Sequence, residues 1–144
     1  MAIGFKTLLS GFGGPYKIAG ILFLGKLVMQ LLTATPYFAD LAFRIPDFVI
    51  GYLHWTFLGI ISPFLFAFLS HLNLIKISKT FVYIYLCGFV LSEMLIFYKA
   101  ISIWLSLSIL NGYLQLLATV SCLLPTAIFL LWLQTFLSQK NRAN

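Results

Sequence analysis

Residues 48–70, FVIGYLHWTFLGIISPFLFAFLS, decide the fold class of this chain. They contain no aspartate, glutamate, lysine or arginine, and they form the longest apolar run in the sequence. A helix needs about 20 consecutive, mostly apolar residues to cross a lipid bilayer. The segment therefore predicts a transmembrane helix, in which Pro63 marks the expected position of a kink.

The composition of the whole chain indicates the same class. Of its 144 residues, 62% are hydrophobic and 8% are charged, whereas about a quarter of the residues in a soluble domain are charged. The net charge is +6, but the basic residues lie between apolar stretches. They therefore predict orientation in a membrane and contact with anionic lipid, and nucleic acid is not an expected partner.

The two cysteines carry no sign of a disulfide or a metal site. Cys87 and Cys122 lie inside apolar runs and lack CxxC spacing. A free cysteine in such a setting behaves as a small hydrophobic residue. We therefore expect both cysteines to be buried, without a disulfide framework or a zinc site.

Three further apolar stretches extend the prediction to the whole chain. We expect one all-α domain over residues 1–144, an integral membrane bundle of about four transmembrane helices. The expected spans are residues 18–34, 48–70, 80–98 and 112–137. Pro125 marks a second expected kink. Residues 101–110, ISIWLSLSIL, could extend the third helix, lie in the membrane interface or form part of a re-entrant turn.

The basic residues are distributed unequally between the two sides of a four-span bundle. Arg44 and Lys99 would lie on one side. The other side would carry Lys6, Lys17, Lys76, Lys79, Lys140 and Arg142. Positively charged loops stay on the cytoplasmic side of a membrane. The sequence therefore predicts a multi-pass inner-membrane protein with both termini in the cytoplasm.

A short amphipathic helix is expected between the first two spans. Thr35 and Pro36 form a typical helix start, and Pro46 marks the end. Apolar and charged residues alternate with helical spacing, and the two sets would occupy opposite sides of the helix. The apolar set is Phe38, Leu41, Ala42 and Ile45, and the charged set is Asp40, Arg44 and Asp47. Such a helix suits the outer membrane interface; the alternative is an ordinary connector.

Each expected span contains at least one polar side chain, and ionisable groups inside a bilayer are costly. The residues are Lys26, Gln30, His54, Glu93 and Gln115. At 1.5 Å per residue, they lie about 5 to 12 Å below the outer ends of their spans. This polar layer could be a binding site or proton relay, or a set of hydrogen bonds that holds the helices together. Lys26 could also extend its long side chain towards the inner interface.

His54 and Glu93 are the most informative members of the polar layer. They lie on adjacent expected spans at nearly the same depth, and each is costly alone in hydrocarbon. A carboxylate that binds one imidazole nitrogen fixes the tautomer and leaves the other nitrogen free as acceptor or ligand. We therefore expect the two side chains to pair, either as a structural contact or as part of a site.

A self-sufficient enzyme is not expected from this sequence. It contains no GxSxG motif, no phosphate-binding glycine loop and no HExxH motif, and it has three acidic residues in total. Hydrolysis and phosphoryl transfer need paired acids, activated nucleophiles or metal ligands. Catalytic residues and a metal site are therefore not assigned.

One stretch resembles a known group of membrane proteins. Residues 28–43, VMQLLTATPYFADLAF, and residues 44–69, RIPDFVIGYLHWTFLGIISPFLFAFL, carry the similarity, which centres on IGYLH at 50–54 and LG at 58–59. The stretch resembles the C-terminal part of larger bacterial multi-pass proteins that are similar to the haem-copper oxidase subunit I and nitric-oxide-response superfamily. The resemblance implies that His54 is a candidate haem ligand. A second histidine motif is missing, so another chain would have to complete an oxidase site.

Two functions therefore remain open at the level of sequence. The first is a membrane interaction or assembly module, which binds another membrane subunit or a second copy of itself within the lipid bilayer. The second is a haem-associated redox or sensory subunit with His54 as ligand. A transporter or channel component is a third alternative, although no inverted repeat or pair of discontinuous helices is visible.

Overall fold

The computed structural model describes residues 14–75 and 77–143, and within these residues every regular element is helical. The all-α prediction is confirmed for this part of the chain. The elements in chain order are α2 (Gly14–Thr33), α3 (Pro36–Arg44), α4 (Pro46–His54), the π-helix η1 (Trp55–Ile61), α5 (Ser62–His71), α6 (Lys79–Trp104), α7 (Tyr113–Ser121) and α8 (Leu123–Ala143).

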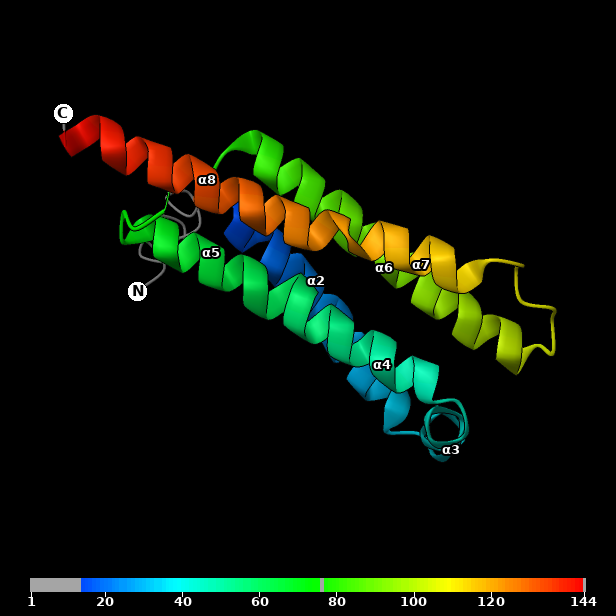
Figure 1. Cartoon of the computed structure of the whole chain (residues 1–144). Coiled ribbons are helices and arrows are strands. Elements are labelled where there is room, and N and C mark those ends of the chain that lie inside the picture. The colour runs from blue at the N-terminus through cyan, green and yellow to red at the C-terminus, as the bar shows by residue number, and fades with distance from the viewer. Residues whose placement is uncertain (1–13, 76, 144) are drawn as a thin grey trace, which may run out of the picture.

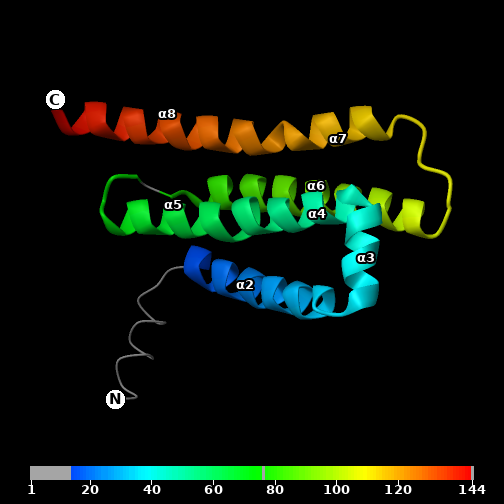
Figure 2. The same ribbon diagram turned by 90° about the horizontal axis from the view of Figure 1, so that it is seen from below.

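The long helices run side by side in an up-and-down order. The continuous rod formed by α4, η1 and α5 lies between α2 and α6, and α6 in turn packs against α7 and α8. Figure 2 shows α2, the rod of α4 and α5, and the rod of α7 and α8 in a row, with α6 behind the middle rod and α3 crossing the end. The starts of α2 and α6 and the ends of α5 and α8 lie at one end of the molecule. The other end carries α3 and the turn at 105–112 (Figure 1).

Three of the rods are long and apolar enough to cross a membrane: Pro46–His71, Lys79–Trp104 and Tyr113–Leu137. The first expected span is shorter, and α2 meets α3 at a bend of 101°. If this bent pair counts as one span, the number of membrane-length elements rises to four. The structure thus gives three or four such elements by length and composition.

The third rod is longer than the sequence predicts. Its helix continues past residue 98 to Trp104, so residues 101–104 extend it, as one of the three alternatives proposed. The helix then ends in a turn over residues 105–112, where Ser106 and Gly112 adopt positive φ angles of 55° and 81°. The positive φ is easy for glycine, which explains the position of Gly112 directly before α7.

The helix containing Pro63 continues through it by a change of hydrogen-bond register. A π-helix is defined by amides that donate five residues back, as the amide of Ser62 does to the carbonyl of Phe57 at the end of η1. Pro63 has no amide hydrogen, so the carbonyl of Leu58, its acceptor in that register, would be left without a donor. The hydroxyl of Tyr85 donates to this carbonyl at 2.8 Å. A side chain of α6 therefore stabilises the irregular turn in its neighbour.

Pro125 has a different effect. Its ring conflicts with the carbonyl four residues earlier, and that residue is Ser121, where α7 ends. Cys122 separates α7 from α8. The break between the two helices therefore lies three residues before the proline. Residues Tyr113–Leu137 still form one membrane-length rod, so a kink at Pro125 stays a prediction.

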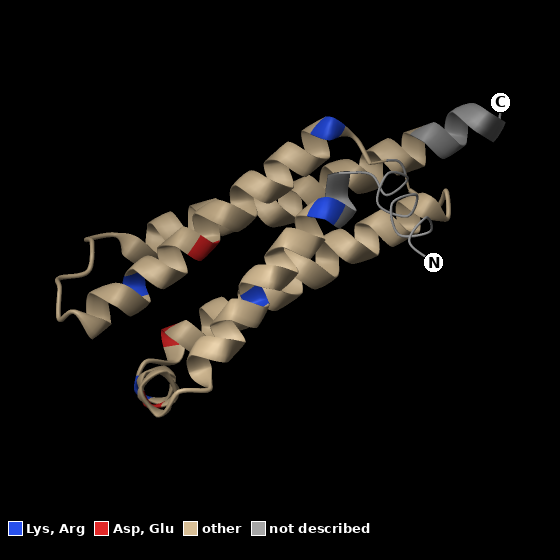
Figure 3. Cartoon of the chain, turned by 180° about the vertical axis from the view of Figure 1, so that it is seen from behind, with Lys and Arg blue, Asp and Glu red and all other residues tan. Residues whose placement is uncertain are grey.

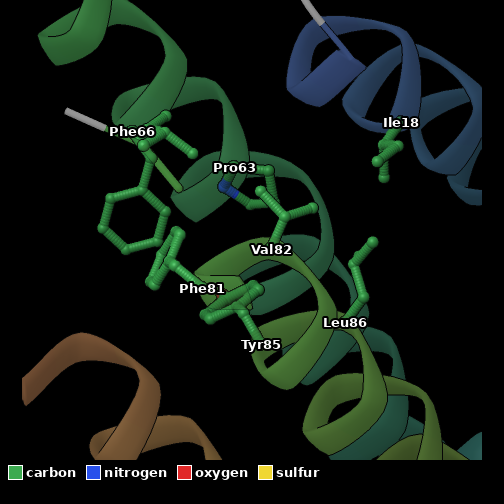
Figure 4. Close-up of a pocket in the computed structure, with 8 residues that line it drawn as sticks. Ile18, Pro63, Phe66, Phe81, Val82, Tyr85 and Leu86 are labelled. Atoms are coloured by element: carbon green, nitrogen blue, oxygen red, sulfur yellow. The ribbon is translucent and has the colours of Figure 1, made fainter. Parts of the chain in front are cut away.

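Aromatic side chains form the centre of the bundle. Phe81 and Tyr85 of α6 pack edge-to-face against Phe66 of α5, with ring centroids 5.2 and 5.6 Å apart; Figure 4 shows the three rings between the two helices. The buried cluster continues through Phe89 to α8. The prediction of buried cysteines is wrong. Cys87 and Cys122 are both exposed, because in this bundle most apolar helix surface faces outward.

The structure has a helix at the expected amphipathic segment. Thr35 is the residue before α3 and Pro36 occupies its first turn, although the Thr35 hydroxyl donates back to the carbonyl of Leu32 instead of capping α3. The charged side is exposed, and Arg44 contacts Asp40 at 2.9 Å. The apolar side of α3 faces the ends of α2, α4 and α6.

The charges divide along the long axis of the molecule. All three acidic residues, Asp40, Asp47 and Glu93, lie in the half that ends in α3 (Figure 3). Lys17 and Lys79 are exposed near the opposite end. The expected positions of Lys6 and Lys76, and of the side chains of Lys140 and Arg142, fall outside the described part of the structure.

Candidate functional site

The contact between α4 and α6 brings together two pairs of ionisable side chains. At its outer end, near α3, the ammonium of Lys99 donates to the carboxylate of Asp47 at 2.8 Å. One turn further in, the ring of Phe97 covers Gly51 so closely that a Cβ on Gly51 would lie 3.0 Å from it. The two helices are thus fixed in register directly before His54.

His54 and Glu93 face each other across this contact. Nδ1 of His54 lies 3.7 Å from Oε1 of Glu93, slightly beyond hydrogen-bond distance. The structure therefore brings together the two residues that sequence analysis expected to pair. Within the described residues, neither this nitrogen nor either carboxylate oxygen of Glu93 has a hydrogen-bond partner. A small movement of either side chain would close the contact.

The two side chains differ in exposure. The Glu93 side chain is 5% exposed, whereas the His54 side chain is 41% exposed although its Nδ1 is buried. Glu93 therefore contacts the imidazole from inside the bundle, and the rest of the ring reaches the molecular surface. A carboxylate in this position can orient the ring and select its tautomer.

The helix directly after His54 is held by neighbours on both sides. Nε1 of Trp55 donates to the carbonyl of Leu22 in α2 at 2.9 Å, and its ring meets Phe89 of α6 at 5.9 Å. A Cβ on Gly59 would lie 2.6 Å from the ring of Phe89. The π-helix η1 is therefore closely packed against α2 and α6. Turns of π-helix are frequent at functional sites.

The other residues of the expected polar layer do not join this pair. Lys26 places its Nζ 5.9 Å from the centre of the Tyr52 ring. Trp55 covers Gly25, and Tyr52 lies closer than Trp55 to the start of α4, where α3 ends. The side chain of Lys26 therefore extends towards the α3 end, and not towards the inner interface that was one alternative for it. Gln30 and Gln115 are exposed. The polar layer is therefore not a connected network.

The contact of Lys99 with Asp47 and the two aromatic donors were not identified from the sequence. Asp47 directly precedes one apolar run, and Lys99 directly follows another. Their opposite charges could therefore have suggested a pair. Tyr85 and Trp55 gave no such signal, because both resemble ordinary apolar bulk. Glu93 lies six residues below Lys99, which corresponds to about 9 Å along α6.

The described residues contain no group of three or more histidine, cysteine, aspartate or glutamate side chains that could hold a metal ion. His71, at the end of α5, is 17 residues from His54. The chain matches no family model, no curated protein and no solved structure. The fold itself defines an all-helical protein of the membrane type, with three or four membrane-length elements.

Proposed function

We propose that this chain is a multi-pass membrane protein that acts as an interaction or assembly module and binds another membrane subunit, or a second copy of itself, at His54. In this proposal four elements span the bilayer and α3 lies in the outer interface. The resemblance of residues 28–69 to haem-copper oxidase and nitric-oxide-response proteins agrees with a role as one subunit of a larger assembly.

The observation that carries this proposal is the exposure of His54. The residue lies within the 26-residue rod Pro46–His71, and its side chain is 41% exposed. Lipid hydrocarbon offers no hydrogen-bond partner, and polar groups within membrane segments almost always face protein or a cavity. A partner that covers the ring removes this cost.

The outward apolar surface also supports an assembly role. In the most apolar stretch of each membrane-length rod, 17%, 39% and 17% of the residues are buried. Most of this surface is available to lipid or to another membrane protein. Without a hydrophobic force between helices in lipid, polar contacts and close packing decide where helices associate, which favours the surface around His54.

The proposed orientation places the turn at 72–78 and both chain ends in the cytoplasm of the cell, at its inner membrane. The basic residues support this orientation. A reporter that is active only in the cytoplasm should therefore work after Asn144 and fail when it is inserted beside Asp47. Equal activity at both positions would contradict the four-span arrangement.

Photo-crosslinking in native membranes tests the proposed interaction surface. Phe57 lies three residues after His54 and is 55% exposed, so a photoreactive phenylalanine analogue at this position leaves His54 intact. We expect one discrete protein adduct, which His54→Ala reduces. The same analogue at Tyr83, 74% exposed on α6, should give no such adduct. Equal adducts at both positions would contradict the proposal.

A haem-associated subunit is the second candidate, and the contact of Glu93 with Nδ1 of His54 is the observation that favours it. Haem-ligating histidines commonly bind a carboxylate or carbonyl through the other ring nitrogen. The described residues fit one axial ligand only, so a partner chain would supply the second. When bound, haem would supply electron transfer or ligand sensing.

Visible absorption of the complex, purified in mild detergent, separates the two candidates. A Soret band that disappears in His54→Ala and is shifted in Glu93→Gln would support the haem-associated subunit. A colourless complex whose assembly still depends on His54 would support the interaction module alone.

A further inference from the structure

An apolar groove lies at the α3 end of the molecule, apart from the contact of His54 with Glu93. Its volume is about 510 Å³, within the usual range for small-molecule sites. The lining comes from four helices, α2, α3, α4 and α6, and is almost entirely hydrophobic. The residues that matter most are Gln30 of α2, Phe38 and Ala42 of α3, Tyr52 of α4 and Trp104 of α6.

The bend between α2 and α3 creates this groove. Because α3 turns by 101° from α2, its apolar side lies across the ends of the other helices while its Asp40–Arg44 pair stays exposed. Phe38 and Ala42 are partly buried on that side. The amphipathic helix α3 therefore covers the groove with its apolar side and exposes its charged side.

The volume of the groove suits one small ligand. At about 510 Å³ it lies within the range of sites that bind a single small molecule, and its almost entirely apolar lining suits a hydrocarbon chain.

A positive charge lies next to one of the residues that line the groove. Lys26 is four residues before Gln30, on the same side of α2, and its Nζ lies 5.9 Å from the ring centre of Tyr52, a lining residue. Such a position is a cation–π contact with the aromatic ring.

None of the ion pairs among the described residues includes Lys26. The chain has three acids in total, and the structure describes all three. Asp40 contacts Arg44, Asp47 contacts Lys99, and Glu93 lies against His54. The ammonium therefore lacks a carboxylate partner among the described residues and lies beside a groove that is otherwise apolar.

We propose that this groove binds a single-chain anionic amphiphile, with its carboxylate at Lys26 and Gln30 and its hydrocarbon chain under α3. The charge of Lys26 recognises the head, and the amide of Gln30 donates a hydrogen bond to it. The apolar lining of the groove accommodates the hydrocarbon chain. The inference is independent of the interaction proposed at His54.

Native mass spectrometry of the full chain, released from detergent micelles, tests this proposal with palmitate as the probe. We expect palmitate to saturate at one molecule per chain and methyl palmitate, which lacks the charge, to bind at least tenfold more weakly. Lys26→Gln should weaken palmitate binding at least tenfold and Lys26→Arg should restore it. Lys17→Gln, at the exposed start of α2, should leave binding unchanged.

Two further measurements complete the test. Ala42→Trp should fill the groove and abolish palmitate binding, while circular dichroism and the elution volume remain those of the unaltered protein. Equal binding of palmitate and its methyl ester would overturn the proposal, as would palmitate binding that survives Lys26→Gln. Preferential binding of phosphatidylglycerol over palmitate would also overturn it, because the occupant would then have two chains.

Discussion

The contact between α4 and α6 contains two pairs of ionisable side chains with different geometry. Lys99 and Asp47 meet at 2.8 Å in a direct hydrogen bond. His54 and Glu93 stay at 3.7 Å, and the buried oxygens of Glu93 have no donor among the described residues. The first pair is satisfied, whereas the second keeps unused hydrogen-bonding capacity.

This difference separates a structural contact from a candidate site. A buried polar group without a partner costs free energy, so a fold tolerates it only where the surroundings fix it or a partner completes it. The surroundings of His54 are fixed by Lys99 on one side and by the close packing of Gly59 on the other. The first pair fixes the register of the two helices, and in the proposed function the second pair meets a partner.

The largest expected effect comes from the packing that fixes this register. Gly59→Ala would place a methyl group 2.6 Å from the Phe89 ring, which is 1% exposed and packs against Trp55. Since the ring has no room to move, we expect a loss of about 3 kcal/mol, at the upper end for overpacking. Unfolding in mixed detergent micelles, followed by circular dichroism, measures this loss.

Gly20→Ala is the matched control, because a Cβ at Gly20 meets nothing within 4 Å. It should be neutral or slightly stabilising, since alanine favours helix more than glycine does. If the two variants unfolded alike, close packing at Gly59 would not be what fixes the rod beside His54.

A smaller effect is expected from the satisfied pair itself. Lys99→Gln leaves the Asp47 carboxylate, 17% exposed, without its cation, and should cost about 2 kcal/mol, as for other hydrogen bonds to charged groups. Arg44→Gln removes a similar contact whose side chains are 73% and 55% exposed. That variant should cost less than about 0.5 kcal/mol, measured by the same unfolding experiment.

The smallest expected effect concerns the π-helix η1. Tyr85→Phe removes the donor of the Leu58 carbonyl and should cost about 1 kcal/mol, because the carbonyl is then left unpaired. Tyr83→Phe, at a position that is 74% exposed, should leave stability unchanged. A Tyr85→Phe variant as stable as the unaltered protein would mean that η1 does not depend on α6.

Much of the fold follows from apolar run length. The long helices, the bend between α2 and α3, and the irregular turns near the two prolines all have clear signals in the sequence. The approach of His54 and Glu93 also followed from similar positions on neighbouring helices. These features depend on the number of residues between positions in the chain, which can be read directly from the sequence.

The rotation of each helix could not be obtained in this way. An amphipathic helix shows its buried side by its polar stripe, but α6 is apolar almost all round. Its sequence therefore did not reveal that Cys87 faces outward or that Tyr85 reaches Leu58. The sequence also did not reveal that Lys26 lies over the Tyr52 ring of another helix.

The mass of the complex extracted with its surrounding lipid tests the central claim most directly, namely that the exposed ring of His54 is where this chain binds a partner. The unaltered protein should be larger than a single chain, and so should Leu53→Ala, whose side chain is similarly exposed, at 45%. His54→Ala should give the mass of one chain while its circular dichroism stays unchanged. An assembly of the same mass in His54→Ala and in the unaltered protein would contradict the account.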